Sequence, residues 1–328
     1  MFQSRSNIWA LREKAGLFQR TSREPVQLTA GPMAAYWPLP SLDGKRIFIA
    51  GYQARNELLR YDLKSDRIAP ALAGLSGTDL EFSKDGKWLT YVSVPERSLF
   101  RAAADGSQRL QLTRPPLAPV MPHWSPDGKQ IAFHGGTPGK PPRIYVAAFD
   151  GGPVRQVSNG ESGNHGDWDP SWPPDGASLA FGATLVDPAA GESIHVVDLK
   201  TNYVSALPGS EGMWSPRWSP DGRFIAGLSG SEFNKLMLYD LRTRKQSQLF
   251  DQGSACPSWS WDGEFLFFAS DNWVWRVRMR DRKVERVTDL RNVRVAGWGW
   301  FATAPNNSFI TARDAGTDEI YALDWEAP

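Results

Sequence analysis

The segment WSPDGKQIAF (124–133) decides the fold, because variants of it recur along the whole chain. Each copy has an aromatic residue or Pro, two further residues, Asp-Gly, a polar residue and then alternating apolar positions. The copies are PSLDGKRIFIAG (40–51), FSKDGKWLTYVS (82–93), WSPDGKQIAFHG (124–135), WPPDGASLAFGA (172–183), WSPDGRFIAGLS (218–229), WSWDGEFLFFAS (259–270) and the weaker TAPNNSFITARD (303–314). Their Asp or Asn recurs every 41 to 48 residues, which indicates a repeat architecture.

Each copy has the pattern of a tight turn between two strands. Pro presets φ, Asp accepts hydrogen bonds from the backbone that follows it, and Gly tolerates a positive φ. Two more short strands follow, as in RIYVAAFD (143–150) and PVRQVS (153–158). Four short antiparallel strands per repeat form one blade of a β-propeller. The sequence therefore predicts an all-β fold, a β-propeller of four-stranded antiparallel blades, with seven blades favoured and eight as the alternative.

We expect one propeller domain over residues 1–328, which starts in the middle of a blade. Residues 1–29 have the pattern of a partial blade, and the full repeats lie near 30–72, 73–113, 114–158, 159–208, 209–250, 251–289 and 290–328. A propeller ring closes when one terminus lends a strand to the blade at the other terminus, because an unpaired edge favours aggregation. We expect PVQLT (25–29) to be that strand in a seven-bladed ring. In an eight-bladed ring, residues upstream would complete one blade.

Composition excludes several classes of protein. Hydrophobic residues make up 41% and charged residues 22% of 328 residues, which is typical of an ordered soluble domain. The net charge of +1 gives no field that would attract nucleic acid or an anionic membrane surface. Cys256 is a single cysteine, so an internal disulfide is excluded. We find no secretion signal and no apolar run of membrane-spanning length, which leaves the compartment open: cytoplasmic by default, or periplasmic if the chain belongs to a membrane-anchored parent.

The motif W-S-P-D-G-K/R-x-I-A-F at 124–133 and 218–226 resembles the TolB-like, or WD40-like, PD40 propeller repeat. IWALREKAGLF (8–18), LPGSEGMWSPRWSPDGR (207–223) and EIYALDWEAP (319–328) resemble the C-terminal propeller region of acidobacterial-type signalling proteins. In those proteins a winged-helix DNA-binding module or a Ser/Thr kinase precedes the propeller. The resemblance implies a sensor or interaction module within a bacterial signalling or regulatory protein.

Motifs of established chemistry are missing from the sequence. There is no G-x-S-x-G nucleophile elbow, no H-E-x-x-H and no P-loop. Asn164, Asp167 and Asp169 could offer oxygen ligands to a hard cation, but a Gly-rich acidic loop is more often solvated. We therefore expect no catalytic residues, no metal and no cofactor.

The channel mouth is the expected ligand site, because the first strand of each blade lines the central channel of a propeller. Positions six and seven before each turn residue are Tyr36 and Trp37, Thr78 and Asp79, Val120 and Met121, Trp168 and Asp169, Trp214 and Ser215, Ala255 and Cys256, and Gly299 and Trp300. The candidate ligand-binding residues are Tyr36, Trp37, Asp79, Met121, His123, His165, Asp167, Trp168, Asp169, Trp214, Arg217 and Trp300. Indoles mixed with charged groups suit a ligand that has an apolar face and polar groups.

Other aromatic residues are expected to be structural. We expect the indoles three residues before the turn Asp to pack between blades, at Trp124, Trp172, Trp218 and Trp259. We expect Cys256 to be a small apolar residue.

Two functions remain open. The first is a non-catalytic module that binds a protein, peptide or small ligand at the channel mouth, and no nucleic acid. The second is a propeller lyase or hydrolase that uses Asp79, Asp167 and Asp169, or the gating domain of a prolyl-oligopeptidase-type peptidase.

Overall fold

The computed structural model describes residues 7–10, 25–31, 33–159, 166–184, 192–229, 235–253, 255–296, 300–306 and 308–324. All regular secondary structure in these ranges is β-strand, which confirms the predicted all-β fold. None of these residues belongs to a helix long and apolar enough to cross a membrane. The chain divides into two compact units, residues 1–56 with 314–328 and residues 57–313.

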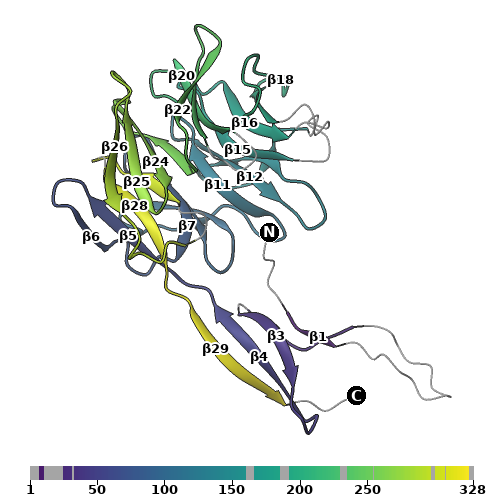
Figure 1. Cartoon of the computed structure of the whole chain (residues 1–328). Helices are drawn as coiled ribbons and strands as arrows, with labels where there is room; N and C mark the ends of the chain where they lie inside the picture. The colour runs from purple at the N-terminus through teal and green to yellow at the C-terminus, as the bar shows by residue number, and fades with distance from the viewer. Residues whose placement is uncertain are drawn as a thin grey trace. The chain divides into compact units, whose positions relative to one another are not determined.

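The larger unit contains six four-stranded antiparallel sheets in its described part (Figure 1). Five of them use strands that are consecutive in the chain. The first two are β7 (Gly77–Phe82), β8 (Trp88–Ser93), β9 (Leu99–Ala103) and β10 (Leu110–Gln111), then β11 (Ala118–Trp124), β12 (Gln130–Gly136), β13 (Arg143–Ala148) and β14 (Arg155–Gln156). The next three are β15 (Asp167–Ser171), β16 (Ser178–Thr184), β17 (Glu192–Asp198) and β18 (Val204–Ala206), then β19 (Met213–Trp218), β20 (Phe224–Ser229), β21 (Lys235–Asp240) and β22 (Lys245–Phe250), then β23 (Ala255–Trp259), β24 (Phe265–Ser270), β25 (Trp273–Arg278) and β26 (Val284–Asp289).

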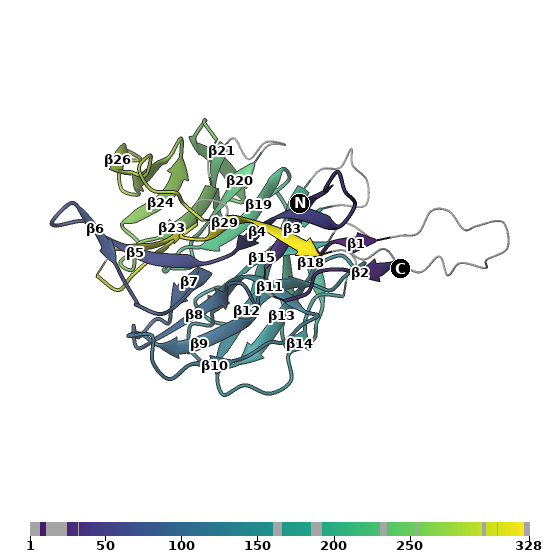
Figure 2. The same cartoon turned by 90° about the horizontal axis from the view of Figure 1, so that it is seen from below.

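The sixth sheet combines strands from both ends of the larger unit. Its order is β27-β28-β5-β6, with β27 (Phe301–Thr303), β28 (Phe309–Asp314), β5 (Asn56–Asp62) and β6 (Arg67–Pro70). The first strands of successive sheets are neighbours in the order β7, β11, β15, β19, β23 and β27, and β27 also contacts β7. Figure 2 shows β7, β11, β15, β19 and β23 towards the middle of this unit. These first strands therefore surround one axis, as the propeller prediction requires.

The smaller unit contains two more sheets. One has the order β29-β4-β3, with β3 (Ala34–Pro40), β4 (Arg46–Gln53) and β29 (Thr317–Asp324), and the other pairs β1 (Trp9–Ala10) with β2 (Val26–Gln27). Eight sheets in the described residues are consistent with the predicted count of seven or eight blades. The predicted division of the chain into repeats stays a prediction.

The expectation that residues 25–29 lend the closing strand is wrong. Among the described residues β2 pairs only with β1, and the strand after the last repeat, β29, pairs over eight residues with β4. An eight-residue ladder satisfies more backbone groups and joins more side chains than a two-residue strand can. The sheet that joins distant parts of the chain uses β5 and β6 instead.

The turns have the geometry that the motif predicts. In the copy between β11 and β12, the Ser125 hydroxyl donates to Asp127 Oδ1 at 2.7 Å, and the backbone N–H of Lys129 donates to the same oxygen at 3.0 Å. Gly128 has φ of 70°, a left-handed conformation that favours glycine. The hydrogen bond from Ser125, followed by that from Lys129, lowers the pKa of Asp127, so the ionised carboxylate stabilises the turn.

Neighbouring sheets of the larger unit are joined by indole hydrogen bonds. The indole N–H of Trp124 donates to the carbonyl oxygen of Glu81 at 3.2 Å, that of Trp172 to His123 at 2.9 Å, and that of Trp259 to Arg217 at 2.9 Å. Each bond crosses from one sheet to the preceding one. The structure thus confirms that these indoles pack between blades.

Candidate functional site

A β-bulge interrupts the first strand in five sheets of the larger unit. The register shifts lie between Thr78 and Glu81, Val120 and His123, Trp168 and Ser171, Trp214 and Arg217, and Ala255 and Ser258. One residue in each bulge has a positive φ although none is glycine: Asp79 (52°), Met121 (48°), Asp169 (53°), Ser215 (53°) and Cys256 (52°). This conformation costs a non-glycine residue roughly 1 kcal/mol or more, so the flanking ladders must maintain it. Each of these five residues lies six positions before the turn Asp, at one of the positions expected to line the channel mouth.

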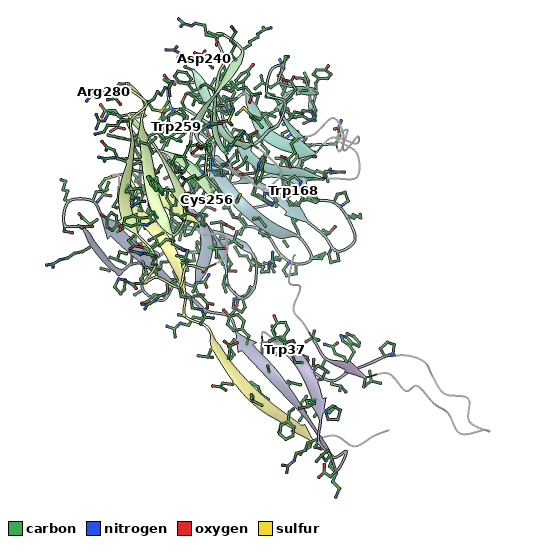
Figure 3. The ribbon with its side chains drawn as sticks, viewed as in Figure 1. Trp37, Trp168, Asp240, Cys256, Trp259 and Arg280 are labelled. Atoms are coloured by element: carbon green, nitrogen blue, oxygen red, sulfur yellow. The ribbon has the colours of Figure 1, made fainter. Side chains whose placement is uncertain are left out.

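A cavity of about 280 Å³ runs along the first strands of the larger unit. Bulge residues line one end, and turn residues such as the exposed Lys84 and Pro174 line the other, where the cavity meets solvent. The walls include Trp124, Trp172, Trp218 and Trp259. Figure 3 labels two lining residues, Cys256 and Trp259, on β23. The end that the bulge residues line, called here the deep end, is therefore ionisable, and the wall is rich in indoles.

Four side chains next to the deep end form a chain of ion pairs. His123 Nδ1 lies 3.1 Å from Glu81 Oε1, and His123 Nε2 lies 3.4 Å from Asp169 Oδ1. Arg217 Nη1 lies 2.8 Å from the same Asp169 oxygen, and the Ser215 hydroxyl donates to the other. Burial acts to raise the pKa of Asp169, but Arg217 and His123 outweigh it and hold this pKa well below its usual range. Asp169 is therefore a buried carboxylate that organises the two cations.

The pKa values of the two histidines of the site are shifted in opposite directions. Burial and the Arg217 guanidinium act to lower the pKa of His123, but Glu81 and Asp169 outweigh them, so this pKa is raised and the imidazolium is favoured. Burial lowers the pKa of His134 to about 4. The neutral ring of His134 accepts the backbone N–H of Asp169 at Nδ1, at 3.2 Å. His134 thus positions Asp169 without adding charge.

Asp79 lines the deep end and forms no ion pair with any described Lys, Arg or His. Burial raises its pKa to about 6, and the negative charge of Asp169 adds to this shift. The backbone N–H of Met121 and the Thr78 hydroxyl, which donates to Oδ2 at 3.4 Å, oppose it. The attraction of His123 also opposes the shift, although no described Lys, Arg or His is in ion-pair contact with Asp79. At neutral pH Asp79 is therefore an ionised carboxylate without a directly paired cation.

The thiol and two of the hydroxyl groups near the cavity have defined protonation or hydrogen-bond partners. Burial raises the pKa of Cys256 to about 12, so its sulfur remains a thiol. The Ser215 hydroxyl donates to Asp169, and Ser258 Oγ lies 3.2 Å from Thr303 Oγ1. Within the described part of the chain, no cluster of three or more His, Cys, Asp or Glu could hold a metal ion. The protonated Cys256 sulfur is therefore a poor nucleophile.

The structure brings five of the predicted site residues to the cavity: Asp79, Met121, His123, Arg217 and Trp300. Asp169 lies behind them, 1% exposed, in contact with Arg217. Tyr36 and Trp37 lie elsewhere, on β3 of the smaller unit. Trp37 occupies the equivalent bulge, with φ of 50°, and is 83% exposed (Figure 3).

The remaining predicted residues pack within the larger unit or fall outside the description. Asp167 is buried and accepts the Ser158 hydroxyl at 2.6 Å. The Trp168 ring lies 5.3 Å from the His134 ring, and Trp214 packs against a buried cluster that includes Leu228. His165 lies outside the described residues.

Sequence reasoning missed Glu81, Lys84 and Trp261 as cavity residues. Lys84 and Trp261 stand directly before the turn Asp, where four other copies have Pro. That Pro packs on the turn glycine of the next sheet: a Cβ on Gly222 would lie 3.3 Å from Pro174. Alignment of the copies would have revealed the three that depart from Pro, which are Lys84, Trp261 and, in the smaller unit, Leu42.

Comparisons with known proteins support the fold. No family model matches the chain. The uncharacterized peptidase YuxL of Bacillus subtilis (strain 168) is 25% identical over 211 residues, which cover 60% of this chain and 30% of that protein. The chain thus spans less than a third of that relative.

Three solved structures of similar fold are informative. The putative TolB from Agrobacterium tumefaciens has a TM-score of 0.64 and 20% identity, covering 80% of this chain and 98% of that chain. TolB from Acinetobacter baumannii has a TM-score of 0.53 and 18% identity, with coverages of 87% and 81%. An oligogalacturonate lyase from Vibrio parahaemolyticus has a TM-score of 0.52 and 9% identity, with coverages of 79% and 97%. At these identities the likeness shows a TolB-like β-propeller fold.

Proposed function

We propose that this chain is a non-catalytic propeller module that binds a protein segment, peptide or small ligand in the cavity along its first strands. The observation that carries this proposal is the combination of an indole-walled cavity with an ionisable deep end and a protonated thiol. Its volume of about 280 Å³ is near the lower end of the range for small-ligand pockets, roughly 300–1,000 Å³. A ligand of a few residues or one small molecule would fill it.

The binding event would be passed to other parts of a longer bacterial signalling or regulatory protein. The resemblance of the repeats to propellers that follow a winged helix or a kinase supports this role. The partial coverage of the peptidase relative is also in line with a module of a larger protein.

A second candidate function is an enzyme or the gate of one. The name of the YuxL relative favours a gating domain of a prolyl-oligopeptidase-type peptidase, and the lyase of similar fold favours a propeller lyase or hydrolase. In the gating role the cavity would admit substrate to a catalytic domain. In the lyase or hydrolase role, Asp79, Asp169 and the buried Asp167 would have to reach the substrate.

A ligand screen with an activity readout separates these functions. The full chain is screened by thermal shift against short peptides, amino acids and oligosaccharides, and each hit is tested for product formation. We expect stabilisation without turnover, weakened by Trp261→Ala at the cavity and unchanged by Trp37→Ala in the smaller unit. Turnover that Asp79→Asn abolishes would establish the enzyme instead.

A further inference from the structure

We propose that the deep end of the cavity is a subsite for an organic cation, an ammonium or guanidinium group, with Asp79 as its counter-ion. This inference rests on the proposed function and specifies the chemistry of its ligand. It starts from the charges around the deep end. Glu81 is paired with His123 and Asp169 with Arg217, whereas Asp79 forms no ion pair with a described side chain and feels only the attraction of His123, which is already paired with Glu81.

An unpaired carboxylate in this position is costly. Asp79 is half-buried, faces the negative charge of Asp169, and occupies a bulge with φ of 52°. Backbone strain and partial desolvation of an unpaired charge both oppose folding. A cationic ligand offsets the second cost, since it supplies the missing opposite charge in a site of low dielectric.

The surroundings of Asp79 suit an organic cation better than a metal ion. Met121, Cys256 and Trp300 line the same end of the cavity, and they offer a thioether, a neutral thiol and an indole. An indole face attracts ammonium and guanidinium groups, and soft side chains pack on their alkyl parts. A hard metal ion needs several oxygen ligands, and no such cluster exists in the described residues.

The cavity also predicts how the ligand enters. Its open end carries the exposed Lys84, and its wall carries indoles. A ligand with one cationic head and an apolar stem would place the stem along the indoles and the head at Asp79. Lys84 would disfavour molecules with many positive charges, because the like charge lies at the mouth.

Isosteric probes test the proposal on the full chain. Butylammonium, butylguanidinium, butanol and butyrate are titrated by isothermal calorimetry at constant ionic strength and pH 8. We expect the two cations to bind at least tenfold more tightly than butanol, and butyrate to bind more weakly than butanol. The preference should shrink at pH 5, where Asp79 is mostly protonated. Asp169, His123 and Cys256 interact electrostatically with Asp79, and Glu81 and Arg217 line the same cavity.

Variants assign the preference to one carboxylate. Asp79→Asn keeps the shape of the side chain and should abolish the preference for cations. Asp150→Asn removes the same charge from an exposed turn and should leave it unchanged, and Lys84→Ala should retain or strengthen it. The proposal is overturned if no cation binds, if Asp79→Asn keeps the preference, or if all four probes bind equally. Equal binding that Trp261→Ala weakens would leave the cavity as a binding site and reject only the cation subsite.

Discussion

The strands β4 and β12 follow the same turn motif but are buried differently. In β12, which lies between two other sheets, Ile131, Ala132 and Phe133 are all 0% exposed. Ala132 belongs to a cluster with Phe181 of the next sheet, and Phe133 to a cluster with Leu99 of the preceding one. In β4 burial alternates, so Phe48 is 37% exposed. The motif thus specifies a hairpin, whereas neighbouring sheets determine how much of it is buried.

Removal of one aromatic ring from each strand should give the largest contrast. We expect Phe133→Ala to lower the free energy of unfolding by about 3–5 kcal/mol, because it leaves a cavity in a fully packed core. Phe48→Ala should cost about 1 kcal/mol or less, since its ring is already partly in water. Urea unfolding followed by circular dichroism measures both values. Equal losses would show that β4 is as deeply packed as β12.

The pH dependence of stability should separate the acid in the cavity from the acid in a turn of the smaller unit. Asp79 has a pKa of about 6, above the ordinary aspartate value of 3.8, so the folded state binds this proton more tightly than the unfolded state. Its effect is a loss of stability as the pH rises from about 4 to about 6, on the order of 2 kcal/mol. The pH-dependent contribution of Asp43 to stability has the opposite sign. Hydrogen bonds from Ser41 and Lys45 lower the pKa of Asp43, so its stabilising contribution is present above the unfolded pKa and is lost as the pH falls.

Asp79→Asn and Asp43→Asn, unfolded in urea between pH 4 and 8, test this difference in sign. Asp79→Asn should remove the loss of stability between pH 4 and 6. The contribution of His123, whose raised pKa gives stability that is lost only at higher pH, remains in both proteins. A wild-type profile that is flat between pH 4 and 6 would contradict the assignment to Asp79.

The turn glycines should give the smallest contrast. Gly86 and Gly44 have φ of 69°, so alanine at either position should cost about 1–2 kcal/mol in backbone strain. A Cβ on Gly86 would also lie 2.9 Å from Pro305, whereas no atom lies within 4 Å at Gly44. We expect Gly86→Ala to cost about 1 kcal/mol more than Gly44→Ala, because Pro305 must move. Thermal unfolding of both variants measures the difference in stability. Identical losses of stability would mean that the Gly86–Pro305 contact between turns is not tight.

Local sequence predicted those parts of the fold that short-range chemistry determines. The Ser-x-Asp-Gly turns follow from residues within a few places of one another, as at Ser125 and Asp127. The bulges at the counted positions were not predicted. Strand partners could not be predicted this way. Ala54-Arg55 and Ala315-Gly316 both have the length of a hairpin turn, yet β4 pairs with β29 and β28 pairs with β5.

The candidate site was predictable only in part for the same reason. Trp37 and Asp79 occupy equivalent bulges, but only Asp79 belongs to the unit that contains the cavity. Glu81 has the alternation of a solvent-facing strand residue, and its pairing with His123 depends on a strand about 40 residues later. Three-dimensional neighbours, rather than local pattern, give these side chains their roles.

The sheet β27-β28-β5-β6 has a consequence for synthesis on the ribosome. Strand β5 begins at Asn56, but its partner β28 begins only at Phe309. At roughly 5–20 residues per second, β5 waits on the order of ten to fifty seconds for that partner. During this interval an edge that contains Leu58, Leu59 and Tyr61, all buried in the finished protein, is exposed. We therefore expect translation speed and chaperone access in that interval to affect the yield of correctly folded protein.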